Sequence, residues 1–227
     1  MTFAVLTLFA PALTTTLLIL TLILAKGEIC PGQRGRIHRL LPALAVLWLA
    51  VASLKIEAFM VVFAIVYFYS RVSKEKTRDK GPFWLLHLAN GLSLSFAAII
   101  VVQQPSVSLS VFVAISGLLI GLAMSSLFLV VAKSRLQAFH RILPVVGVVV
   151  SMFCVVALAW NLSSWDDAFI ESSLSLIVVS IVLLFVGIGF WCWPLIKHTP
   201  AKPLGTALGL LALIGATAPM LSLFWHQ

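Results

Sequence analysis

The 227-residue chain is 62% hydrophobic, only 10% charged, and carries a formal net charge of +8. A soluble domain usually has about a quarter charged residues and no more than about half apolar ones. A water-soluble fold with this composition would expose large apolar patches, which soluble proteins avoid. The composition therefore predicts an all-α polytopic membrane protein. Its predicted partners are membrane lipids and not nucleic acid, because retention of Lys and Arg on the cytoplasmic side explains the basic excess.

Eight segments are predicted to cross the membrane. A spanning helix needs about 20 mostly apolar residues. Six runs meet this length, and the first lacks the basic leader of a signal peptide, which indicates a retained helix. The stretch from Leu40 to Ser70 is too long for one helix and is interrupted by Lys55 and Glu57, which predicts two short helices. The predicted helices cover residues 3–25, 40–54, 57–71, 82–103, 107–132, 141–160, 171–196 and 203–225.

The distribution of basic residues predicts the orientation. Lys and Arg cluster around residues 26–39, 71–80, 133–141 and 197–202, whereas the loops at 103–106 and 161–171 contain none. Because basic loops stay in the cytoplasm, the chain must cross an even number of times between Arg39 and Arg71. A single long helix there would bury Lys55 and Glu57, at a cost of about 2.5–3.5 kcal/mol for each charge. We therefore expect a short hairpin of helices 2 and 3, both termini outside, and a bacterial cytoplasmic (inner) membrane location.

Two short segments resemble each other and predict an internal repeat. Residues 36–42 read Arg-Ile-His-Arg-Leu-Leu-Pro, and residues 138–144 read Ala-Phe-His-Arg-Ile-Leu-Pro. Each copy follows a helix that ends in Ala-Lys and opens the next helix. The prediction is a duplicated unit, with residues 1–103 as the first four-helix repeat and 107–227 as the second. An even number of helices in each gives both repeats the same orientation, as in parallel-repeat transporters.

Three histidines are candidate cofactor ligands. His38, His140 and His87 all map to the cytoplasmic side of the predicted topology, and histidine is a common metal and haem ligand. A site shared between the repeats would use the equivalent pair His38 and His140, with His87 as a third member. The alternative is that these side chains contact lipid headgroups. No ligand spacing typical of a metal site is present, so haem is the cofactor hypothesis and a metal is left open.

Small polar residues within the spans are candidates for a polar pathway. Asn90, Ser93, Thr15 and Ser125 lie inside predicted helices, where polar side chains usually face the bundle interior. They could equally form interhelical hydrogen bonds worth about 1 kcal/mol each. Two small-residue stripes, at Gly117/Gly121 and Gly205/Gly209, predict close helix packing within the subunit. Six tryptophans near the span ends indicate an interfacial aromatic belt, at positions 84, 160, 165, 191, 193 and 225.

Three functions fit these features. The first is a small permease or transport-associated component, with a path between the two four-helix halves. The second is a membrane redox subunit that binds haem or quinone near the cytoplasmic face. The third is a structural or assembly subunit whose partners are other membrane subunits. No catalytic residue is predicted, because the chain has no phosphate loop, nucleophile elbow or zinc-protease motif.

Overall fold

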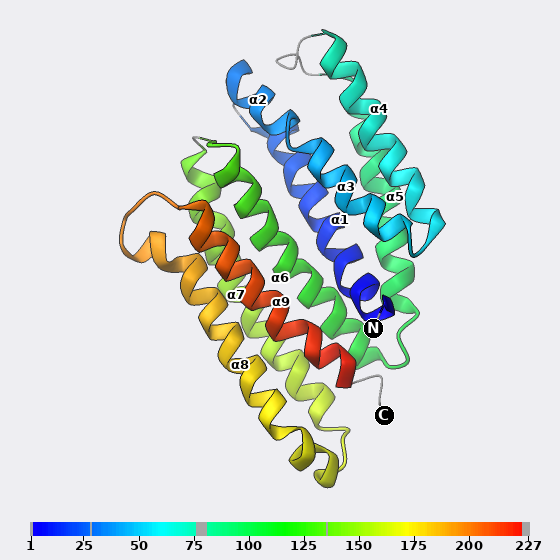
Figure 1. The fold of residues 1–227 in the computed structure, drawn as a ribbon, viewed down its shortest axis with the longest axis vertical. Coiled ribbons are helices and arrows are strands. Elements are labelled where there is room, and N and C mark those ends of the chain that lie inside the picture. Colours follow the sequence, from blue (N-terminus) through cyan, green and yellow to red (C-terminus); the bar gives the residue numbers. More distant parts are fainter. Residues whose placement is uncertain (1, 28, 76–80, 135, 224–227) are drawn as a thin grey trace.

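The computed structural model describes residues 2–27, 29–75, 81–134 and 136–223 (Figure 1). All regular structure in these ranges is helical, which confirms the all-α prediction. The α-helices are α1 (Thr2–Lys26), α2 (Pro31–His38), α3 (Leu41–Ala52), α4 (Phe59–Glu75), α5 (Phe83–Val102), α6 (Val107–Val131), α7 (Gln137–Leu162), α8 (Asp167–Ile196) and α9 (Pro203–Leu223). A 3-10 turn, η1 (Ile56–Ala58), joins α3 to α4.

Within the described residues, seven segments are long and apolar enough to span a membrane. They are Leu6–Lys26, Pro31–Ala52, Phe83–Val102, Val107–Val131, Gln137–Leu162, Asp167–Ile196 and Pro203–Leu221. The second of these combines α2 with α3. The predicted short hairpin is present as α3 and α4, of 12 and 17 residues. At 1.5 Å per residue, α3 alone is roughly 18 Å long, which is less than a hydrocarbon core of about 30 Å.

The short helix α2 is absent from the sequence-based expectation. It begins at Pro31, whose missing N–H is tolerated in the first helical turn. It is more polar than the spans, so it has no apolar run by which it could be recognised. Arg39 and Leu40 join α2 to α3, and α3 begins with Pro42 in its first turn.

The helices pack as two rings of four. In the first, α1 packs on α3, α3 on α4, α4 on α5, and α5 on α1. In the second, α6 packs on α7, α7 on α8, α8 on α9, and α9 on α6. We call α1–α5 the first half and α6–α9 the second half. The largest contact between the halves is that of α1 with α6, and α5–α6 and α1–α9 make smaller ones.

The contact between α1 and α6 is a close approach of small residues. A Cβ added at Gly117 would overlap Pro11, and one added at Gly121 would overlap Thr15 and the carbonyl oxygen of Ala12. The Gly117/Gly121 stripe thus packs within the subunit, as predicted. In the second stripe, Gly209 packs on α8, and the space beside Gly205 is open.

One end of the bundle gathers the basic segments. The helix ends that flank them lie along the upper end of the bundle in Figure 1, from the α8–α9 loop at the left to the end of α4 at the top. The turns at residues 53–58, 103–106 and 163–166 lie at the opposite end, with the start of α1 and the end of α9.

Two tryptophans of the predicted aromatic belt are buried rather than exposed. Trp84, Trp160 and Trp193 are exposed, as a belt requires, whereas Trp191 is only 2% exposed. Its indole lies against Gly147 of α7, where the absence of a side chain leaves room for the ring. Trp165 is also buried, and Trp225 lies outside the described residues.

Candidate functional site

His38 is fully buried at the end of α2. Its ring meets that of Phe68 on α4 edge-on, with 5.6 Å between the ring centroids. The side chain is therefore enclosed within the first half, rather than presented to lipid headgroups. A sequence pattern of His beside Arg could not show this, because the burial depends on where α4 packs.

His140 and His87 have different surroundings. The His140 Nε2 atom lies 3.3 Å from Ser134 Oγ and 3.1 Å from the Ser134 carbonyl oxygen, so this histidine braces the turn between α6 and α7. His87 is exposed on α5. Among the residues that the structure describes, no group of three or more His, Cys, Asp or Glu side chains is placed to hold a metal ion.

Asn90 and Ser93 lie together in the first half, at the interface of α5 with α1. The Thr14 hydroxyl donates to the Ser93 carbonyl oxygen at 3.0 Å, and the Ser93 hydroxyl donates to the Asn90 carbonyl oxygen at 3.0 Å. Asn90 is 8% exposed, and its side-chain Oδ1 is buried without a hydrogen-bond partner. A buried acceptor of this kind is uncommon in folded proteins and calls for an explanation.

Thr15 and Ser125 lie on the other flank of α1, next to α6. The Thr15 hydroxyl donates to the Pro11 carbonyl oxygen at 3.0 Å, within its own helix. The Ser125 hydroxyl donates to the Gly121 carbonyl oxygen at 2.7 Å, also within its own helix. The four predicted pathway residues therefore form two groups on opposite flanks of α1, rather than one continuous row.

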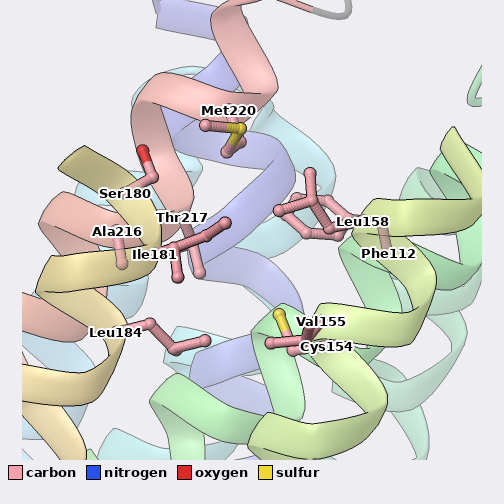
Figure 2. Close-up of a pocket in the computed structure, with 10 residues that line it drawn as sticks. All are labelled: Phe112, Cys154, Val155, Leu158, Ser180, Ile181, Leu184, Ala216, Thr217 and Met220. Atoms are coloured by element: carbon pink, nitrogen blue, oxygen red, sulfur yellow. The ribbon is translucent and has the colours of Figure 1, made fainter. Parts of the chain in front are cut away.

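A small cavity lies inside the second half (Figure 2). All four helices of that ring line it, and its volume is about 20 Å³, enough for one water molecule. The lining is Phe112, Cys154, Val155, Leu158, Ser180, Ile181, Leu184, Ala216, Thr217 and Met220. Ser180 is 3% exposed, and its hydroxyl oxygen has no hydrogen-bond partner. This serine is not among the predicted site residues, since one Ser in an apolar run carries little signal.

The comparisons with known proteins agree with the membrane fold. A family model described as an integral membrane domain matches residues 1–224. An uncharacterized protein of Haemophilus influenzae is 28% identical over 141 residues, which are 58% of this chain and 53% of that relative. The chain thus matches about half the length of that relative. No solved structure matches the chain. Since the family model covers nearly every residue, the chain belongs to this integral membrane domain family.

Proposed function

We propose that the protein is a small permease built from two parallel four-helix halves. The observation that carries the proposal is the packing order, because each half closes its ring in the same sequence of contacts. If the first helix of one half corresponds to the first helix of the other, α1–α6 is the contact at the symmetry axis. The smaller α5–α6 and α9–α1 contacts are then equivalent to each other. A pseudo-twofold axis along the membrane normal, as in parallel-repeat transporters, accounts for this pattern.

The repeated sequence supports the same correspondence. Residues 36–42 span the junction of α2 and α3, and residues 138–144 lie in the first turns of α7. Both copies therefore open the second span of their half, at the same end of the bundle.

The proposed path runs beside α1, because polar side chains in the interior of the bundle gather next to this helix. Asn90 Oδ1 is the feature that indicates a solute or water, since it is a buried acceptor without a partner. The second part of the path lies between the halves, on the opposite flank of α1 from Asn90, and it is closed at Gly117 and Gly121 in this structure. A permease in which one half rocks against the other would open this contact in a second state.

Water access to Asn90 tests the path. In a background with Cys30, Cys154 and Cys192 changed to Ser, we expect Asn90→Cys to react with a charged, membrane-impermeant methanethiosulfonate. Thiols react as thiolates, which form only where water is present. Ala123→Cys on α6, at a position 2% exposed, is the matched control and is expected not to react. If the Asn90→Cys variant is unreactive from both sides of the membrane, the part of the path beside Asn90, between α1 and α5, is rejected.

The proposed orientation has the basic end in the cytoplasm of a bacterium, eight crossings and both termini outside. Alkaline phosphatase fused after Ser106 or Ser164 should be active, since these positions lie at the end without Lys or Arg clusters. Phosphatase fusions after Ser134 or Thr199 should be inactive. Green fluorescent protein fused at these two positions should instead be fluorescent. An inactive phosphatase at Ser106 would reject an even number of crossings between Arg39 and Arg71.

A further inference from the structure

A side chain of α2 joins the two halves at the basic end. The Arg36 guanidinium Nη1 donates a hydrogen bond to the carbonyl oxygen of Lys133 at 3.0 Å. Arg36 belongs to the first half, and Lys133 follows the last turn of α6 in the second. Both residues are exposed, so the contact lies at the surface of the bundle.

The turn that carries Lys133 is fixed on two sides. Lys133 has a left-handed backbone, with a φ of 49°, which is uncommon for a residue with a side chain. The next N–H, that of Ser134, donates back to the Leu129 carbonyl oxygen at 3.1 Å and closes the end of α6. His140 Nε2 lies against Ser134 from the start of α7. The turn therefore presents its carbonyl to Arg36 from a defined position.

This contact places the Arg36 side chain at the backbone of another basic residue and neutralises neither charge. The acceptor is an uncharged carbonyl oxygen, and it belongs to a residue that is itself a cation. Among the described residues, no carboxylate forms an ion pair with Arg36 or Lys133. Two further cations lie on the same segment: Arg34, whose Nε is buried without a partner, and the exposed Arg39. The junction thus concentrates positive charge from both halves.

We propose that Arg36 and Lys133 bind the headgroup phosphate of an anionic phospholipid at the junction of the two halves. A guanidinium has five N–H donors, and one of them is used by the Lys133 carbonyl. Arg binds phosphate oxygens in a forked geometry, and Lys adds a point charge. The helix ends of a membrane protein lie at headgroup level, and the cytoplasmic leaflet is rich in anionic lipid. The lipid site shares the orientation given under the proposed function but does not depend on transport.

Lipid retention by the full-length protein tests the site. The protein is placed in nanodiscs of phosphatidylcholine with a minority of phosphatidylglycerol, released, and examined by native mass spectrometry. We expect phosphatidylglycerol to be retained in preference to phosphatidylcholine. Arg36→Gln and Lys133→Gln should each lower its retention about fivefold, corresponding to ~1 kcal/mol for each basic residue near an anionic surface. Arg36→Lys should keep part of the retention, because it keeps the charge and loses the fork.

The control is Lys202→Gln, which removes one exposed charge from the α8–α9 loop at the same end of the bundle. It should leave retention unchanged. An equal loss in Lys202→Gln and Lys133→Gln would show general surface attraction and overturn the site. Equal retention of the two lipids by the unmodified protein would also overturn it. Because Lys133→Gln keeps the backbone carbonyl, it tests the charge even if Arg36→Gln fails to fold. The cysteine and fusion experiments above report on the path and orientation independently.

Discussion

The two halves close the same ring of four helices but fill it differently. The first half uses short second and third helices, α3 and α4, and encloses Trp48 and Phe68 completely. The second half uses α7 and α8, of 26 and 30 residues, and leaves a small cavity between its helices. One packing order is therefore compatible with unequal helix lengths and with interiors filled to different degrees.

The halves also differ in how much of each helix faces the surroundings. In α1, 67% of the spanning window is buried inside the protein, against 28% in α8. Apolar side chains on the outside of α8 include Val182, Phe185 and Trp193, all more than half exposed. For a membrane helix these residues are in lipid, which costs them little. Helix α1 therefore depends more on side-chain packing, and α8 depends more on the bilayer.

The largest effect is expected from a substitution that removes a large buried side chain from the interior of the first half. Trp48→Ala removes a fully buried indole that packs edge-on against Phe96. We expect a loss of about 3–5 kcal/mol in the free energy of unfolding, as for other buried Trp truncations. Unfolding in detergent micelles measures it, with Trp84→Ala as control, because Trp84 is 63% exposed. Equal losses in both variants would show that the indole of Trp48 contributes no packing.

The next effect concerns the contact between the halves. Gly121→Leu forces a side chain against Thr15 and the Ala12 carbonyl, so we expect a loss of about 1–3 kcal/mol from overpacking. The melting temperature of the purified protein measures it. Gly189→Leu is the matched control, since nothing lies within 4 Å of a Cβ added there. A Gly121 variant as stable as the Gly189 variant would mean that α1 and α6 can separate freely.

A smaller effect distinguishes the two flanks of α1. Thr14→Val removes a hydroxyl that donates to the Ser93 carbonyl of α5, and about 0.6 kcal/mol should be lost, a typical value for such bonds in membranes. Thr15→Val is its control, because the hydroxyl of Thr15 donates within its own helix. Chemical unfolding curves of the two variants should differ in midpoint. If Thr15→Val is the more damaging, the α6 flank is the more important one.

The smallest effect concerns the cavity of the second half. Ser180→Ala removes a buried hydroxyl without a protein partner, so stability should change by no more than about 0.5 kcal/mol, or rise. Ser125→Ala removes a hydroxyl bonded to the Gly121 carbonyl at 2.7 Å and should cost about 1 kcal/mol. Thermal unfolding of the pair makes the comparison. A clear loss in Ser180→Ala would indicate that a bound water satisfies this hydroxyl and that the cavity is occupied.

Much of the fold could be predicted from the sequence, because the length of an apolar run and the positions of charged residues do not depend on tertiary contacts. The short hairpin around Lys55 followed from the cost of burying a charge, and the structure has it as α3 and α4. Helix α2 could not be found in this way, because a short polar helix has no apolar run. Its one local signal was Pro31, at a position where proline favours a helix start.

The candidate site was less predictable, because it depends on which face each helix turns inward. Asn90 and His87 are three residues apart on α5, yet Asn90 is buried and His87 is exposed. Their sequence spacing does not give the rotation of the helix. His38 is enclosed by Phe68, a residue from a helix that the sequence could not place beside it. The proposed histidine cofactor site therefore stays a prediction, with its three members in different surroundings.

The central position of α1 has a consequence for how the protein is made. This helix is synthesised before α5 and α6, but the carbonyl oxygens that accept from Thr14 and Thr16 belong to Ser93 on α5 and Gly121 on α6. The nascent helix therefore enters the bilayer before its partners exist, and its hydroxyls would face lipid without those partners. The same two hydroxyls also lie 2.9 Å from the carbonyl oxygens of Ala10 and Ala12 in their own helix, so the single hydrogen of each has a local acceptor as well. These local acceptors can satisfy the hydroxyls of α1 in the bilayer until α5 and α6 are translated.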